Sequence, residues 1–175
     1  MMSVVSFFWL CLVLFAFVGW IRGWAKELLV AFSAILALAL NFILRRYIPL
    51  VENLAEEDLT LFWVRTIILI VLVYFGYQTV SISRLTAKAT REKVQDALFG
   101  GILGGFNGYL IVGSLLYWYD VANYPYPEFI AAPTDPSVVN TVNQMMAYMP
   151  PQLLGEPGIY FAIIIAFIFV LVVYI

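Results

Sequence analysis

The sequence contains no histidine and a single cysteine, and these two scarcities exclude most familiar catalytic and metal-binding chemistry. Without an imidazole the chain cannot form a Ser-His-Asp or Cys-His catalytic centre, a histidine-bound zinc site or a histidine-ligated haem. Cys11 has no partner for an internal disulfide, and in its apolar surroundings it is expected to pack as a small hydrophobic side chain. We therefore predict a protein that is not an enzyme and holds neither a metal nor another cofactor.

Charged residues are also scarce, since they make up 11% of the chain, whereas 64% of the residues are hydrophobic and the mean hydropathy is +0.96. A soluble domain of ordinary composition would be about a quarter charged. The composition therefore predicts an integral membrane protein with the lipid bilayer as its first partner. The few basic residues gather near the ends of apolar runs and not along one stripe, so nucleic acid is not an expected partner.

Five apolar runs are long enough to cross a bilayer, and all should be helical because lipid cannot satisfy an open backbone. The runs are Ser3–Ile21, Leu28–Leu44, Leu59–Val80, Ala97–Tyr119 and Ile159–Ile175. We predict an all-α, polytopic helical bundle in which residues 1–158 form a four-span domain and residues 159–175 an additional C-terminal transmembrane helix. The short connection Arg22–Glu27 favours a tight hairpin with the first two helices side by side and antiparallel.

The basic residues are distributed unevenly between the two sides of this arrangement. One side carries Arg22, Lys26, Arg84, Lys88, Arg91 and Lys93, and the other carries Arg45, Arg46 and Arg65. The 39 residues from Asp120 to Gly158 contain no Lys or Arg. The positive-inside rule therefore predicts that the N-terminus and this long loop lie outside and the C-terminus inside.

For two groups of charged residues near the predicted membrane surfaces, the sequence predicts a role only in general terms. Arg84, Lys88 and Arg91 have helical spacing and could face anionic headgroups together, but the sequence favours a simple role in orientation and solubility. Arg45 and Arg46 are expected to reach the outer headgroups or to pair with nearby acids. Those acids are Glu52, Glu56, Glu57 and Asp58, and their spacing favours a solvated face over a metal site.

Glycine is concentrated in the fourth apolar run, where Gly100, Gly104 and Gly108 recur every four residues. On a helix this spacing, a glycine zipper, leaves a groove that lets another backbone come close. The groove could pack within the bundle, or it could form a seam with another membrane subunit or a second copy of the chain. Asn107 lies beside it and is expected to hydrogen-bond across helices rather than to line a transport path.

An outer amphipathic helix is predicted between Asp135 and Met149. Asp135 is a suitable N-cap, Pro136 suits the first helical turn, and Pro150 should end the helix together with Pro151. One face is apolar and consists of Val138, Val139, Val142, Met145, Met146 and Met149. We expect this face to seal against the bundle, the outer leaflet or a partner protein.

Two motifs connect the chain with a known family. The first, G-x-x-R-G-x-x-[KR]-E-[LA], is matched by Gly19, Arg22, Gly23, Lys26, Glu27 and Leu28; the second is matched in part by Asp96, Gly100, Gly104, Gly108 and Ile111. Over roughly its first 150 residues the chain thus resembles the colicin V production protein (CvpA) family. It departs from the family pattern at Ala97 and Asn107, where the family usually has Arg, and at Phe99, where it has Leu.

The resemblance implies a small multi-pass protein of the bacterial inner membrane, linked to colicin V production or export and to envelope maintenance, without an agreed molecular activity. Within this frame Arg22 is expected to reach headgroups or cap carbonyls, and Glu27 to complement the dipole of the second helix. Two other function classes stay open. One is a structural accessory subunit of a larger membrane complex, such as a bioenergetic complex, and the other is a small transporter or channel.

Overall fold

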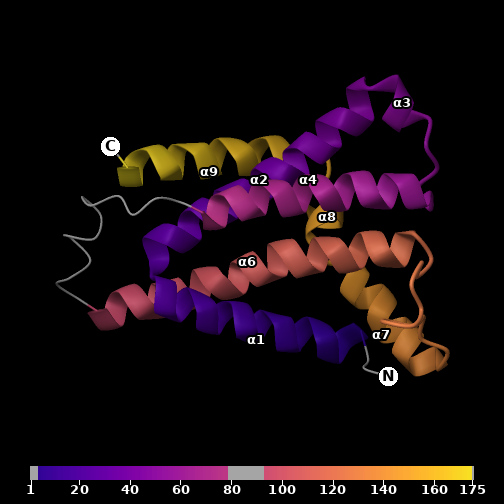
Figure 1. The fold of residues 1–175 in the computed structure, drawn as a ribbon, viewed down its shortest axis with the longest axis horizontal. Helices are drawn as coiled ribbons and strands as arrows, with labels where there is room; N and C mark the ends of the chain where they lie inside the picture. Colours follow the sequence, from indigo (N-terminus) through magenta and orange to yellow (C-terminus); the bar gives the residue numbers. More distant parts are fainter. Residues whose placement is uncertain (1–3, 79–92, 175) are drawn as a thin grey trace.

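The computed structural model describes residues 4–78 and 93–174, and within them all regular structure is helical (Figure 1). The helices are α1 Val4–Arg22, α2 Trp24–Tyr47, α3 Pro49–Glu52, α4 Leu59–Tyr77, α6 Lys93–Val121, α7 Pro136–Ala147, α8 Pro150–Leu153 and α9 Gly158–Tyr174. The predicted all-α bundle is therefore confirmed. The basic group Arg84, Lys88 and Arg91 lies outside the described residues.

Four of the predicted spans, α1, α2, α4 and α6, are long and apolar enough to cross a membrane. The fifth, α9, is strongly apolar but has only 17 residues and is shorter than the other four. At 1.5 Å per residue it extends for about 25 Å, less than the roughly 30 Å of a typical hydrocarbon core.

Helix α6 packs against α1 along one side and against α2 along another, and α2 also contacts α4 and α9 (Figure 1). The N-terminus, α3 and α7 lie at one end of the bundle, and the C-terminus lies at the opposite end. This arrangement places the N-terminus and the long loop after α6 at the same end, as the predicted topology requires.

The predicted hairpin of the first two helices is wrong. Only Gly23 separates α1 from α2, and its backbone has φ of 85° and ψ of 157°, a conformation that is essentially restricted to glycine. From this turn α1 diverges from α2 and packs along α6 instead. The reason is that the glycines of α6 and α1 allow a closer helix contact than α2 offers.

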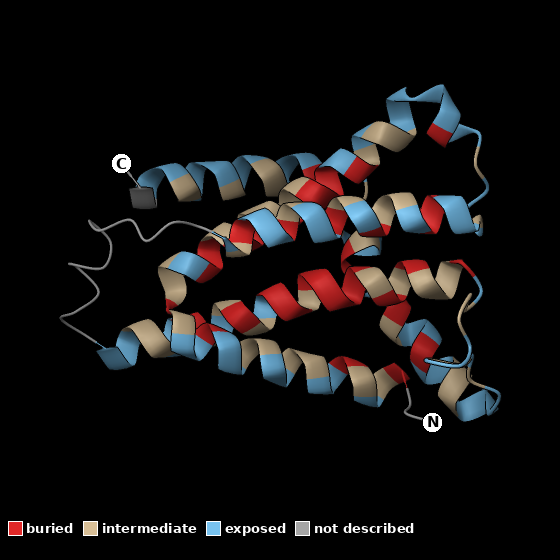
Figure 2. Ribbon diagram, in the orientation of Figure 1, coloured by how far each residue is buried: buried red, intermediate tan, exposed pale blue. Residues whose placement is uncertain are grey.

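Buried side chains concentrate where α2 and α6 face the rest of the bundle, whereas α1, α4 and α9 expose apolar outer faces (Figure 2). Trp9 and Phe17 of α1 are each more than half exposed, as are Ile165 and Val172 of α9. In water such surfaces would be a severe liability, but in a bilayer they face acyl chains. The burial pattern therefore agrees with a membrane-embedded bundle.

Helix α7 begins as the sequence predicts. The Asp135 carboxylate accepts hydrogen bonds from the backbone N–H of Ser137 at 2.8 Å and from the Ser137 hydroxyl. These hydrogen bonds, the one from the hydroxyl first, lower the pKa of Asp135 below its ordinary value. The helix ends at Ala147, earlier than predicted, because Pro150 occupies the first turn of the separate helix α8.

The apolar face of α7 is docked on the bundle. Val142, Met146 and Met149 are buried, and they form one cluster with side chains of α1 and α6. Val138 and Met145 are partly buried at the edge of this cluster. The face was expected to pack against the bundle, the outer leaflet or a partner protein, and in the structure it packs against the bundle.

Candidate functional site

The two sequence motifs meet at the contact between α1 and α6. A Cβ atom added to Gly19 would overlap the backbone of Gly100 and lie 2.7 Å from the Cα atom of Gly104. A Cβ atom added to Gly104 would overlap the carbonyl oxygen of Phe15, and one on Gly108 would lie 2.8 Å from the Phe15 Cβ atom. The glycine groove of α6 thus receives α1, so it is filled within the chain.

The turn between α1 and α2 is held by a carboxylate from α6. The backbone N–H of Trp24, at the start of α2, donates to Asp96 Oδ1 at 3.1 Å. A Cβ atom on Gly23 would lie 2.6 Å from Asp96 Oδ2, so the carboxylate occupies the space that a side chain there would need. Asp96 therefore accepts a hydrogen bond from one of the free N–H groups at the start of α2. Its negative charge also interacts favourably with the positive end of the α2 helix dipole.

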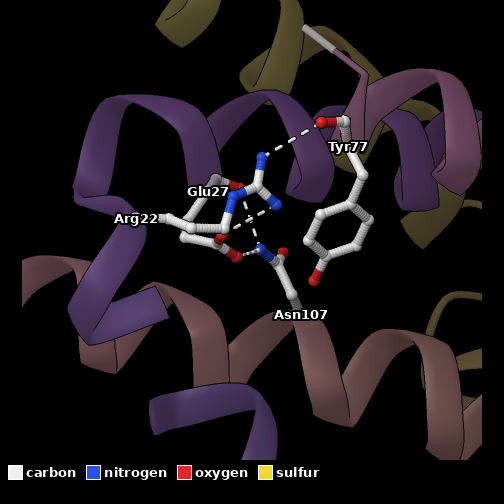
Figure 3. Close-up of polar contacts among 4 residues, drawn as sticks. All are labelled: Arg22, Glu27, Tyr77 and Asn107. Atoms are coloured by element: carbon white, nitrogen blue, oxygen red, sulfur yellow. Dashed lines mark hydrogen bonds and ion pairs between the residues drawn. The ribbon is translucent and has the colours of Figure 1, made fainter. Parts of the chain in front are cut away.

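One turn further along α2, Glu27 is fully buried, with 0% of its surface exposed. The Asn107 side-chain amide in α6 donates to Glu27 Oε2 at 2.7 Å and to the Glu27 backbone carbonyl at 2.9 Å (Figure 3). Both acceptors require the nitrogen of the amide, so the orientation of Asn107 is fixed by its partners. Its Oδ1 atom is left buried without a hydrogen-bond partner among the described residues.

Arg22, the last residue of α1, provides the counter-charge. Its Nη1 atom lies 3.4 Å from Glu27 Oε1, and its Nη2 atom donates to the backbone carbonyl of Tyr77 in α4 at 3.2 Å. The guanidinium also lies over the Tyr77 ring, 4.3 Å from its centroid (Figure 3). Arg22, Glu27, Tyr77 and Asn107, here called the buried polar cluster, thus come from four different helices.

Burying a charged pair costs several kcal/mol per ion unless good hydrogen bonds and the attraction between the charges offset that cost. In the buried polar cluster Asn107 supplies one hydrogen bond to the Glu27 carboxylate, and Arg22 supplies the opposite charge. The side chain of Arg22 is 21% exposed and keeps part of its hydration. The cluster therefore connects four helices through polar contacts inside an apolar bundle.

Sequence reasoning identified most of these residues but not their grouping. Glu27 lies in the first turn of α2 as expected, yet it is buried against α6 and does not face the surface. Arg22 donates to a backbone carbonyl, in line with one of its two expected roles, but this carbonyl belongs to α4, and Arg22 also pairs with the carboxylate of Glu27. Tyr77 was missed altogether, since its carbonyl and ring give no signal in the sequence. Lys26 is exposed and does not take part in the buried polar cluster.

The apolar face of α7 lies far from this site along the chain and in space, at the other end of the bundle (Figure 1). The residues of that face, Val142 and Met146 among them, therefore do not belong to the buried polar cluster.

Comparison with known proteins matches residues 6–139 to the family described as "Colicin V production protein". The matched range includes α2, α4, α6 and all of α1 except its first two residues, and therefore all four residues of the buried polar cluster. No curated protein and no solved structure matches the chain significantly.

Proposed function

The chain belongs to the colicin V production protein family, and from this membership we propose that it is a non-enzymatic, multi-pass protein of the bacterial inner membrane that takes part in colicin V production or export and in envelope maintenance. The N-terminus and the loop after α6 lie outside, and the C-terminus lies inside.

The observation that supports a non-enzymatic role is that both motif carboxylates, Glu27 and Asp96, are engaged in contacts between helices. The Glu27 carboxylate is engaged by Asn107 and Arg22, and the Asp96 carboxylate is engaged by the start of α2. A general acid or base needs access to a substrate proton. A carboxylate with 0% exposure that is enclosed by three helices serves instead to fix the positions of those helices.

Complementation of colicin V secretion tests this function. A bacterial strain that lacks its own family member and carries the colicin V genes would express this chain, and colicin V would be quantified in the medium and inside the cells. We expect secretion to be restored by the chain and by Lys26→Gln, which changes an exposed motif residue. Glu27→Ala should lose folded protein and secretion together. Failure of the intact, inserted chain to restore secretion would contradict a role in production or export.

Envelope maintenance has its own measurement in the same strain. Growth in the presence of a bile salt or dilute detergent should fall when the family member is absent and recover when the chain is expressed. Unchanged detergent sensitivity would remove envelope maintenance from the proposal without affecting the secretion result.

The topology is tested by cysteine labelling. In a background where Cys11 is replaced by Ala, a cysteine at Ile130 should react with a membrane-impermeant maleimide added outside intact inner-membrane spheroplasts. Labelling only after the membrane is permeabilised would reverse the orientation.

A second candidate function, an accessory subunit of a larger membrane complex, is favoured by α9. This helix lies beyond the family match, contacts α2 along one side and exposes apolar side chains along the other. Between α9, α2 and α6 lies a half-open apolar cavity of about 260 Å³ that includes Phe32, Phe106 and Phe169. Extraction in a mild detergent followed by identification of co-purifying proteins should yield a stoichiometric partner if this function is correct. A chain that purifies alone at several detergent concentrations would contradict it.

A further inference from the structure

A second polar site lies at the opposite end of α2 from the buried polar cluster. Here a cavity of about 100 Å³ opens where α2, α4 and α6 meet the chain around α8 and the start of α9. Its polar lining comes from Asn41, Arg45 and Arg65, and its apolar walls include Phe42 and Trp118. We refer to it as the arginine cavity. It is large enough for more than one water molecule, whose share of liquid volume is about 30 Å³.

The charged side chains that line the arginine cavity itself are both positive. Arg45 Nη2 lies 2.7 Å from Glu56 Oε1, and Arg65 Nη2 lies 2.9 Å from Glu56 Oε2. One carboxylate therefore serves two guanidinium groups, and Glu56 itself is half exposed. Among the described lining residues of the arginine cavity there is no acidic side chain, and two further carboxylates, Glu52 and Glu156, line the adjacent cavity that Arg45 also borders.

Arg45 also retains hydrogen-bonding capacity. The Nη1 atom of Arg45 is buried and has no hydrogen-bond partner within the described part of the chain. The Arg65 side chain is only 12% exposed. A buried N–H group without an acceptor is costly, and the cost is greatest when the group is charged. The two guanidinium groups and the free donor of Arg45 together make the arginine cavity a suitable environment for an anionic acceptor.

We propose that the arginine cavity binds one phosphate-type oxyanion, supplied either by the headgroup of an anionic phospholipid or by free phosphate. Planar guanidinium groups match the spacing of phosphate oxygens and bind them through paired, charge-assisted hydrogen bonds. Arg45 lies in the last turn of the membrane-spanning helix α2, at the depth where headgroups begin. The site is independent of the role in colicin V production.

A second cavity of about 280 Å³ lies next to the arginine cavity. The two cavities share Phe42 and Arg45, and the outer one is also lined by Arg46, Glu52 and Glu156. Its two carboxylates disfavour an anion there, which leaves the inner cavity as the binding position. Arg46 lines only the outer cavity and therefore serves as a matched control, since it carries the same charge one residue away.

Two binding measurements on the purified full-length chain distinguish the two sources of phosphate. In a neutral detergent, inorganic phosphate is titrated against chloride at constant ionic strength while the melting temperature is followed by tryptophan fluorescence. In nanodiscs of phosphatidylcholine with a minor fraction of phosphatidylglycerol, native mass spectrometry reports which lipid stays bound. Stabilisation by phosphate alone identifies a free-anion site, and selective retention of phosphatidylglycerol identifies a headgroup site.

Three variants test whether the arginine cavity is responsible. Arg45→Gln and Arg65→Gln should each weaken binding by about tenfold or more, as expected for the loss of a charge-assisted hydrogen bond. Arg46→Gln should leave the affinity within about twofold of the original, an allowance for screened long-range charge. Glu56→Gln removes the competing carboxylate and should tighten binding, a gain that a folding defect cannot imitate.

The proposal is overturned if neither inorganic phosphate nor phosphatidylglycerol binds in preference to its control. It is also overturned if Arg46→Gln weakens binding as much as Arg45→Gln, because a general surface charge would then explain the attraction. Weaker binding by Glu56→Gln would likewise contradict it.

Discussion

The side-chain amide of Asn107 donates to both the carboxylate and the backbone carbonyl of Glu27, a residue 80 positions earlier in the chain. This pair joins α6 to α2 at the level where Arg22 joins α1 to α4. Because the contacts lie inside an apolar bundle, each partner depends on the others for its hydrogen bonds and its charge balance. Arg22, Glu27 and Asn107 thus stabilise the contacts between these helices together.

The first prediction concerns the coupling between Arg22 and Glu27. Arg22→Gln should cost about 3–5 kcal/mol of unfolding free energy, because it leaves a fully buried carboxylate without its counter-charge. Glu27→Gln should cost less, since the remaining guanidinium is partly exposed. The double variant should be more stable than the sum of the single effects predicts, with a coupling of roughly 0.5–3 kcal/mol. Unfolding in mixed detergent micelles, followed by circular dichroism, measures all three variants, and additive effects would contradict the ion pair.

The second prediction compares two neighbouring glycines of α6. Gly104→Ala should destabilise the bundle by about 1–3 kcal/mol, because the new Cβ atom would overlap the backbone of α1. At Gly105 the nearest atom to an added Cβ is the Ala16 Cβ at 3.7 Å, an ordinary contact. Gly105→Ala should therefore be neutral or stabilising, since alanine favours the helix by up to about 1 kcal/mol. Thermal unfolding of both variants in one detergent decides the matter, and equal melting temperatures would argue against close packing of α1 on α6.

The third prediction concerns the docking of α7. Val142 is only 1% exposed and packs against side chains of α1 and α6. A buried, unpaired carboxylate at this position would cost several kcal/mol of docking free energy, so Val142→Asp should release α7 from the bundle. Asn143→Asp, on the exposed face of the same helix, provides the control and should leave docking intact. Amide hydrogen exchange in Pro136–Ala147 reports the release. Unchanged protection in Val142→Asp would show that α7 is held by the leaflet instead.

The fourth prediction follows from the lowered pKa of Asp135. The folded state favours the ionised carboxylate, so the cap contributes stability above the ordinary aspartate pKa of about 3.9, and this contribution is lost as the pH falls through the lower pKa of the folded state. Helix α7 should then fray at its first turn. Asp135→Asn retains a capping side chain that does not titrate and should remove the acid-induced fraying. The chemical shift of the Ser137 amide, followed by nuclear magnetic resonance between pH 5 and pH 2.5, measures this fraying. The same pH dependence in the original chain and in Asp135→Asn would contradict the cap.

The sequence predicted what depends on local pattern and composition. Apolar length identified the spans, and the sequence from Asp135 to Pro150 identified α7 almost to the residue because cap, apolar face and stop agree with one another. The partners of each helix were not predictable in the same way. A short connection suggested that α1 pairs with α2, but the contact area lies on α6, because Gly19 and Gly104 permit closer approach.

The buried polar cluster shows the same limit at the level of single residues. Glycine spacing in the fourth run indicated close packing without naming α1 as the neighbour. Likewise, the sequence suggested that Asn107 bonds across helices but could not show that its partner is Glu27, since that depends on how α2 and α6 are placed. Tyr77 contributes a backbone carbonyl, which every residue possesses, so no sequence pattern could have singled it out.

The most direct test of a structural role for the buried polar cluster is colicin V secretion per folded molecule in cells that express Arg22→Gln/Glu27→Gln. This double variant removes both charges, keeps the size of the side chain at position 27 and leaves Asn107 an acceptor there, while it shortens the side chain at position 22. If the cluster only holds the helices together, secretion normalised to the amount of inserted, folded protein should equal that of the original chain. An abundant, correctly inserted double variant that secretes no colicin V would contradict this role and assign the charges a direct part in the activity.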